Sequence, residues 1–155
     1  MLNPRPPHAG LVFVLSGPSG VGKDSVMDCL RREPLDLHFC VTATTRARRQ
    51  TEVHGVNHYF VTDDEFQAMI AAGELLEWAR VHEHYYGVPL SEVRRAFAQQ
   101  RDVFMRIDVQ GAATVRARLP QSVLIFLAPG RLEDLAPRLK NRGTETPEEM
   151  ALRLA

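Results

Sequence analysis

A glycine-rich turn between an apolar run and an amphipathic segment constrains this chain more than any other feature. Residues 17–23 read Gly-Pro-Ser-Gly-Val-Gly-Lys and fit the pattern G-x-x-x-x-G-K. The apolar run Leu11 to Leu15 predicts a strand buried on both faces, as in a parallel sheet. After the turn, Val26, Met27 and Leu30 recur at helical spacing within residues 25–32. A strand, a glycine-rich loop and a helix in this order predict the start of an α/β fold.

The loop predicts a binding site for a chain of phosphates. Its glycines let successive backbone N–H groups turn inward, and the following helix adds the partial positive charge of its N-terminus. Lys23 would place a compact ammonium against the terminal phosphates. Lysine occurs only at positions 23 and 140, so the other 17 of the 19 basic residues are arginine. This scarcity favours a role for Lys23 that a guanidinium cannot fill.

The residue after this lysine is Asp24, where such loops normally carry a Ser or Thr that binds Mg²⁺. Carboxylate oxygens also suit Mg²⁺, so we expect Asp24 to contact the metal. The alternative is that Asp24 repels the phosphates or partly neutralises Lys23, which would weaken nucleotide binding.

The rest of the chain repeats the alternation of strands and helices. Residues 103–107 and 123–127 predict two further buried strands, with a short helix over 110–118 between them. Another helix is predicted over 132–141, where leucines form one stripe. We therefore predict a single α/β domain, residues 1–155, with a parallel sheet and helices on both of its faces.

Residues 39–88 differ from this pattern and predict an insertion at one edge of the parallel core, which comprises residues 10–38 and 89–141. Shorter, alternating strands with aromatic residues are predicted over 56–61 and 75–81. Between them, Thr62 and Glu65 form a capping box that begins a helix over 63–72.

Three arginines follow a predicted strand over 39–41. Arg46, Arg48 and Arg49 form a local cationic patch in a chain whose 19 basic and 19 acidic residues balance. Guanidinium groups match phosphate oxygens through paired hydrogen bonds, although a solvated loop would have the same composition. In a chain that already has one phosphate-binding loop, a second anion site suggests a phosphorylated acceptor.

Composition excludes several classes of protein. The sequence pI of about 7.0 argues against a globally basic nucleic-acid binder, and no apolar run approaches the roughly 20 residues that cross a bilayer. Residues 1–8 lack the apolar core of a signal peptide, so we expect a cytoplasmic protein without nucleic-acid or membrane partners. Cys29 and Cys40 have no metal-binding spacing, and we expect both to be buried.

Taken together, these motifs resemble the guanylate kinase family. The match runs in order from about Leu11 to the end of the chain. Beyond the phosphate-binding loop, it rests on the segments Thr44-Thr45-Arg46 with Arg49, Glu52-Val53-His54-Gly55, Glu77-Trp78-Ala79, Tyr85-Tyr86-Gly87, Ile107-Asp108-Val109-Gln110-Gly111 and Arg142-Gly143-Thr144-Glu145. The resemblance implies a P-loop fold with a GMP-binding insertion over 39–88 and a lid over 142–155. It also implies Mg²⁺-dependent transfer of the γ-phosphoryl group of ATP to GMP.

Carried over residue by residue, the resemblance implies four sets of site residues. The ATP site would consist of Gly17, Pro18, Ser19, Gly20, Val21, Gly22, Lys23, Asp24 and Ser25. The GMP site would consist of Thr42, Arg46, Arg49, His58, Glu77, Tyr86 and Asp108. The catalytic residues would be Lys23, Arg46, Arg138 and Arg142, with Arg153 as a further lid arginine. Asp24 and Asp108 would be the candidates for binding Mg²⁺.

The physical chemistry of these residues agrees with the implied roles. A buried Glu77 would accept hydrogen bonds from guanine N1–H and N2–H₂, and adenine offers no such pair of donors. Asp108 ends a predicted strand beside the phosphate-binding loop, which suits a metal ligand or a group that orients the phosphate-binding arginines. Arg138 and Arg142 are four residues apart on a predicted helix, so they share one face and could close over the transferred group.

The chain departs from the family pattern at several positions. Besides Asp24, His58 replaces a tyrosine that contacts the GMP phosphate, and its shorter reach puts that contact in question. Val88 replaces a Ser or Thr and loses one polar contact. Arg106 replaces an acid, and its candidate partners are Asp108 and an incoming phosphate. The chain stops nine residues after the helix start at Thr146, so we expect it to lack the family's C-terminal end.

Two alternative functions stay open at this point. One is a non-catalytic guanylate kinase-like binding module, although such modules often lose the loop lysine and glycines that are retained here. The other is a different small-molecule kinase, because a Gly-Lys-Asp-Ser loop also resembles that of ribose 1,5-bisphosphate kinase. Glu77-Trp78 and Tyr85-Tyr86-Gly87 favour a guanine nucleotide.

Overall fold

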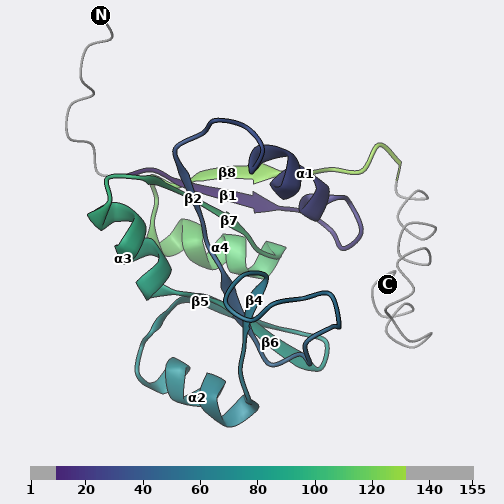
Figure 1. Cartoon of the computed structure of the whole chain (residues 1–155), viewed down its shortest axis with the longest axis vertical. Helices are drawn as coiled ribbons and strands as arrows, with labels where there is room; N and C mark the ends of the chain where they lie inside the picture. The colour runs from purple at the N-terminus through teal and green to yellow at the C-terminus, as the bar shows by residue number, and fades with distance from the viewer. Residues whose placement is uncertain (1–9, 132–155) are drawn as a thin grey trace, which may run out of the picture.

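The computed structural model describes residues 10–131, in which a parallel sheet forms the core (Figure 1). The sheet has the strand order β2-β7-β1-β8, and its three pairings are all parallel. Its strands are β1 (Val12–Ser16), β2 (Leu37–Phe39), β7 (Asp102–Arg106) and β8 (Val123–Phe126). The predicted parallel core is therefore confirmed. The predicted helix over 132–141 and the lid over 142–155 lie outside the described residues.

Helices cover both faces of this sheet because the side chains of β1 alternate between them. Val12 and Val14 share a core cluster with residues of α3 (Leu90–Ala98) and α4 (Val109–Arg118). Phe13 and Leu15 point the other way and pack with residues of α1 (Lys23–Leu30). None of the helices within residues 10–131 is long and apolar enough to cross a membrane.

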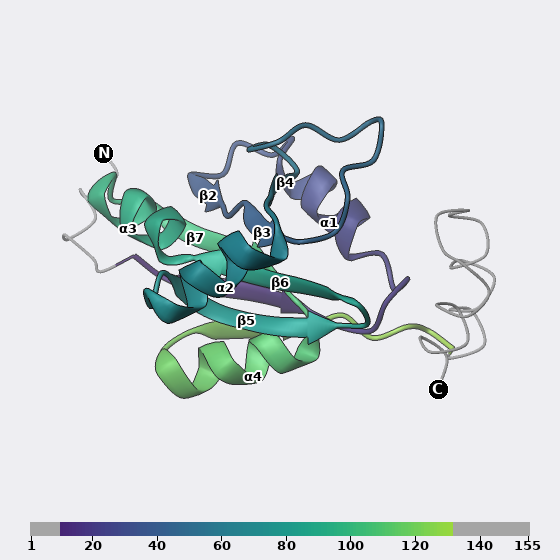
Figure 2. The same cartoon turned by 90° about the horizontal axis from the view of Figure 1, so that it is seen from below.

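A second, mixed sheet has the strand order β4-β3-β6-β5 and overlaps the predicted insertion, which its last strand in the chain exceeds by one residue, Pro89. Its strands are β3 (Thr42–Thr44), β4 (His58–Phe60), β5 (Leu75–Val81) and β6 (His84–Pro89). Helix α2 (Asp63–Ala71) packs Phe66 against it, and the predicted capping box of Thr62 and Glu65 is present. Figure 2 shows α2 on one side of β5 and β6, with α4 on the other side.

Three elements were not predicted, and one strand and one cysteine were predicted wrongly. Strand β6 and helix α3 fill the segment after residue 81, although Leu90, Val93 and Phe97 of α3 do recur at helical spacing. The predicted strand over 39–41 is wrong, because Phe39 ends β2 of the first sheet and the unpredicted β3 begins only at Thr42, in the second sheet. Cys40 is buried as expected, but Cys29 is exposed. Cys29 lies two positions from Met27, the buried residue of α1, and therefore on the opposite side of that helix.

Candidate active site

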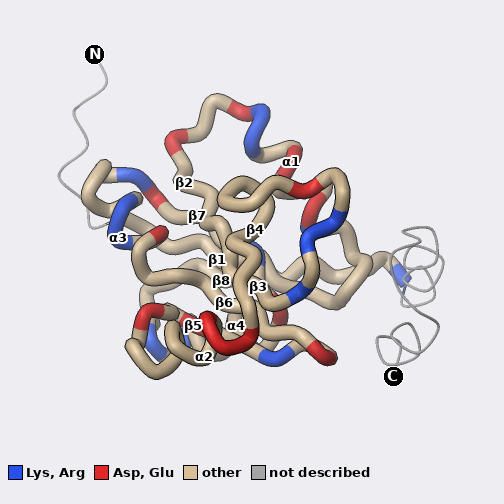
Figure 3. Tube along the Cα trace, turned by 60° about the horizontal axis from the view of Figure 1, so that its bottom comes forward, with Lys and Arg blue, Asp and Glu red and all other residues tan. Residues whose placement is uncertain are grey.

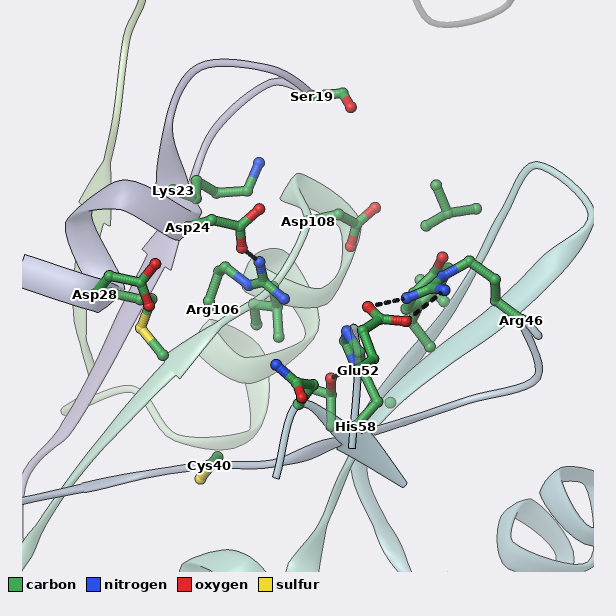
Figure 4. A pocket seen from close by; sticks show the side chains of 18 of the residues that line it. Ser19, Lys23, Asp24, Asp28, Cys40, Arg46, Glu52, His58, Arg106 and Asp108 are labelled. Atoms are coloured by element: carbon green, nitrogen blue, oxygen red, sulfur yellow. Dashed lines mark hydrogen bonds and ion pairs between the residues drawn. The ribbon is translucent and has the colours of Figure 1, made fainter. Parts of the chain in front are cut away.

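A cavity of about 390 Å³ opens where the two sheets meet. The phosphate-binding loop and the end of β7 line it from the core, and β3, β5, β6 and the β3–β4 loop line it from the second sheet. The carboxyl ends of β1 and β7 meet here, which is where open α/β sheets bind ligands. Figure 4 shows side chains from both parts of the fold converging on this cavity.

The phosphate-binding loop has the predicted backbone form. Gly17, Gly20 and Gly22 adopt positive φ angles of 149°, 80° and 107°. At Gly17, a Cβ atom would lie 2.3 Å from the Leu127 carbonyl oxygen, so only glycine fits. The ammonium of Lys23 donates to the carbonyl oxygens of Gly17, at 2.6 Å, and Pro18, at 3.0 Å. The lysine is therefore held over the loop that would cradle phosphates.

Arg46 and Glu52 form a two-pronged ion pair at the other end of the cavity. The guanidinium of Arg46 donates to the two carboxylate oxygens at 3.0 Å and 2.8 Å. Glu52 also accepts the backbone N–H of Arg49 at 2.9 Å. These contacts, above all the Arg46 hydrogen bonds, lower the pKa of Glu52 to about 2. Burial disfavours the charged form of Arg46, but hydrogen bonds to Glu52 and Tyr86 outweigh it and raise the pKa of Arg46.

His58 lies next to this pair and is buried. Its Nδ1 atom lies 2.7 Å from Oγ1 of Thr42, and its ring meets the ring of Tyr86 edge-on. Burial, reinforced by the charge of Arg46, lowers the pKa of His58 below its ordinary value of 6.5. The imidazole is therefore neutral at pH 7.

Glu77 is buried on β5, with 2% of its surface exposed. Burial raises its pKa to about 8, and the charge of Asp108 adds to this, while the backbone N–H of Val88 and the charge of Arg118 oppose it. A Cβ atom on Gly111 would lie 2.4 Å from Oε2 of Glu77, so the glycine leaves room for the carboxylate. Such a group can accept hydrogen bonds from a ligand that supplies two donors.

Asp108 is the N-cap of α4, and its Oδ1 accepts the backbone N–H of Gly111 at 2.8 Å. It lines the same cavity as Lys23 and Glu77. This contact fixes the carboxylate at the end of β7, between the two ends of the cavity.

Comparisons with known proteins show the family of this chain. A family model described as guanylate kinase matches residues 10–155. The chain belongs to the guanylate kinase family. It is 47% identical over 145 residues to a guanylate kinase of Halalkalibacterium halodurans, and the matched region covers 94% of this chain and 71% of that protein. It is 48% identical over 153 residues to a guanylate kinase of Mycolicibacterium paratuberculosis, and here the matched region covers 97% of this chain and 69% of that protein.

A solved structure shows the same fold. The crystal structure of guanylate kinase from Anaplasma phagocytophilum matches with a TM-score of 0.70 and 29% sequence identity, over 94% of this chain and 72% of that one. The chain thus has the P-loop α/β fold of guanylate kinases and spans about 70% of the length of these relatives.

The structure brings together most of the residues that the sequence assigned to the site. The predicted residues that line the cavity are Ser19, Gly20, Gly22, Lys23, Asp24, Thr42, Arg46, Arg49, His58, Glu77, Tyr86 and Asp108. Gly17, Pro18, Val21 and Ser25 are not among its lining residues, and Ser25 is exposed. Arg138, Arg142 and Arg153 lie outside the described residues.

One of the two predicted partners of Arg106 is wrong. The sequence left Asp108 or a phosphate as that partner, and the structure pairs Arg106 with Asp24 instead of Asp108. The register explains this, because Arg106 lies opposite Leu15 on the strand that leads into the phosphate-binding loop. The contact of Arg106 with a phosphate stays a prediction. Val88, at another departure from the family, is fully buried in the main core cluster.

Sequence reasoning missed Glu92, a fully buried carboxylate in the first turn of α3. It accepts the backbone N–H of Val41 at 3.0 Å and the hydroxyl of Tyr59 at 2.9 Å, both from the insertion. It also pairs with His38 and Arg95 of the core. Glu92 therefore joins the core to the insertion, and no motif could reveal it because its partners are distant in sequence.

Glu92 also lies close to two other groups that bind metals in proteins. Within the described part of the chain, the ligand atoms of His38, Cys40 and Glu92 lie within 4.8 Å of one another. The carboxylate already accepts hydrogen bonds from four groups, and burial, reinforced by the charge of Glu92, raises the pKa of the Cys40 thiol. We interpret this cluster as a structural junction.

Proposed function

We propose that this chain transfers the γ-phosphoryl group of ATP to GMP and releases ADP and GDP, with the site residues named above. The observation that carries the proposal is a single cavity with a phosphate-binding loop at one end and both a buried carboxylate and an arginine clamp at the other. Nothing in the geometry favours a ribose bisphosphate, which has no base for Glu77 to bind.

The GMP end of the cavity selects the base and holds its phosphate. Glu77 accepts hydrogen bonds from guanine N1–H and N2–H₂, and a buried carboxylate left without donors disfavours adenine. Arg46, which Glu52 holds in place, binds the GMP phosphate together with Arg49 and Tyr86. Thr42 and the neutral His58 complete this side of the site.

The ATP end positions the phosphoryl donor. Backbone N–H groups of the loop and the N-terminus of α1 bind the phosphates, and Lys23 offsets negative charge near the transferred group. A GMP phosphate oxygen is already nucleophilic, so the protein needs no general base and acts by alignment and electrostatics. Arg138 and Arg142, which lie outside the described residues, are proposed to close over the transferred group.

The donor groups at the centre of the cavity fit Mg²⁺, which prefers oxygen ligands. Asp108 presents a carboxylate that Gly111 orients, whereas Asp24 is engaged with Arg106. We therefore propose that Asp108, directly or through water, holds Mg²⁺, and that Asp24 is the less suitable of the two predicted ligands. When bound, Mg²⁺ would neutralise charge on the phosphates of ATP.

A coupled assay of ADP formation tests this proposal with GMP, AMP, UMP and ribose 1,5-bisphosphate as acceptors. We expect turnover with GMP alone and a loss of at least about a hundredfold in Lys23→Ala and Arg46→Ala. Arg94→Ala, at an exposed position on α3, is the matched control and should retain wild-type turnover. Full activity in Lys23→Ala, or equal turnover with AMP, would refute the assignment. GMP binding without any turnover would point to the binding module.

A further inference from the structure

The ion pair between Asp24 and Arg106 joins two departures from the family pattern into one feature. Asp24 is in the first turn of α1, directly after Lys23, and Arg106 is the last residue of β7. The two side chains come from neighbouring parts of the core because β7 pairs with β1, the strand that enters the phosphate-binding loop.

Both members of the pair face the cavity. Asp24 and Arg106 line it together with Lys23 and Asp108, and the side chains are 46% and 26% exposed. Figure 4 shows the guanidinium of Arg106 between the side chains of the phosphate-binding loop and those of Glu52 and His58. In the proposed function, this part of the cavity is where the phosphates of the two nucleotides meet.

The chemistry of a guanidinium suits this place. A guanidinium carries five N–H donors in a fixed plane, so it can bind a carboxylate and a phosphate oxygen at the same time. Asp24 alone would repel an incoming phosphate, and pairing with Arg106 removes that repulsion. The carboxylate in return fixes the guanidinium, which lowers the entropic cost of binding a phosphate.

We propose that Arg106, anchored by Asp24, is a catalytic residue that binds the phosphates at the junction of the two nucleotides. This inference rests on the proposed function, because it places a phosphate bridge in this cavity. Asp24 then acts as a positioning residue for Arg106. The carboxylate stands where such loops usually carry a hydroxyl, and the guanidinium of Arg106 balances its negative charge.

The test uses a probe in which adenosine and guanosine are joined through a pentaphosphate chain, so that phosphates span the whole cavity. Its affinity and those of GMP and ADP alone are measured by calorimetry for the full chain and for Asp24→Asn, Arg106→Gln and the double variant. Arg94→Gln on the surface of α3 is the matched control and should bind as the wild type does. Thermal melts establish that each variant is folded.

We expect Arg106→Gln to weaken the bridged probe by about tenfold to a hundredfold, the usual effect of losing a charged hydrogen bond, and to leave GMP and ADP within about twofold. Asp24→Asn should weaken the probe in the wild-type background, because Arg106 loses its anchor. In the Arg106→Gln background the same change should strengthen binding, because it removes an unbalanced carboxylate. This reversal of sign would distinguish the proposal from a merely structural tie between α1 and β7.

Equal probe affinity in wild type and Arg106→Gln would overturn the inference, as would an effect of Asp24→Asn with the same sign in both backgrounds. Failure of the wild type to bind the probe at all would also overturn it. A wild type that binds the probe but does not phosphorylate GMP would refute the proposed function, while the affinity comparison would still decide the role of Arg106.

Discussion

Replacing Glu77 by Gln should stabilise the protein and at the same time damage its GMP site. The buried carboxyl has a pKa of about 8, against 4.5 for an ordinary glutamate, mainly because burial disfavours its charge. The gap between these two values corresponds to about 5 kcal/mol of unfolding free energy when the group is fully ionised. Gln keeps the shape and an acceptor oxygen but carries no charge, so the variant avoids this penalty.

The sign of the effect depends on pH in a defined way. Below about pH 4.5, Glu77 is protonated in both the folded and the unfolded chain, and it carries no penalty. Between about 4.5 and 8 the unfolded chain ionises first, so the stability contributed by this group falls as pH rises, by about 3 kcal/mol at pH 7. Above about pH 8 the difference is constant. The advantage of Glu77→Gln over wild type should therefore grow across this window and then level off.

Urea unfolding of both proteins at about pH 5, 7 and 9 measures this difference, and other titrating groups cancel in the comparison. Calorimetry with GMP measures the functional side: we expect a loss of about tenfold or more in affinity and release of a proton when the wild type binds GMP. Buffers with different heats of ionisation report that proton. A stability difference that does not change with pH would refute the burial argument, and unchanged GMP affinity would show that Glu77 does not bind the base.

Three other substitutions test the surroundings of the site. Gly111→Ala places a Cβ atom 2.4 Å from Oε2 of Glu77. We expect the variant to lower the unfolding free energy by about 1–3 kcal/mol and to weaken the binding of GMP but not of ATP, whereas an ordinary helical Gly→Ala change stabilises a protein. Urea unfolding measures the first effect and calorimetry the second. Glu92→Gln removes the charge that joins core and insertion, and urea unfolding should show a loss of about 2 kcal/mol or more; an unchanged midpoint would contradict the junction. Glu52 has a pKa of about 2, so its contribution to stability is complete above about pH 4.5 and is lost as pH falls towards 2. Thermal melts of Glu52→Gln at acid pH should therefore lack this loss of stability between about pH 4.5 and 2. The same variant should bind the GMP phosphate more weakly, because Glu52 no longer holds Arg46 in place.

The parts of the fold that local sequence determines were predictable. A continuous apolar run, a glycine-rich turn and a capping box each specify one element through contacts between near neighbours, and β1, α1 and α2 follow these signals closely. Helix α3 also carries apolar residues at helical spacing, but nothing in the local sequence shows that its Glu92 is buried among them. Besides Arg95 of the same helix, the partners of Glu92 are His38 of β2, Val41 just before β3 and Tyr59 of β4, which the fold brings to it from far along the chain.

The site shows the same division between local and distant information. The backbone cradle around Lys23 lies within seven consecutive residues, so its sequence pattern is sufficient to identify it. The partner of Arg106 depends instead on which strand lies beside β7, so Asp24 was not among the partners predicted before the strand order was known. Asp108 is nearer in sequence, but its carboxylate caps α4, whereas parallel pairing with β1 carries Arg106 to the first turn of α1. The acid Asp24 is therefore best explained together with Arg106 on the adjoining strand, because an isolated carboxylate at a phosphate site would oppose binding.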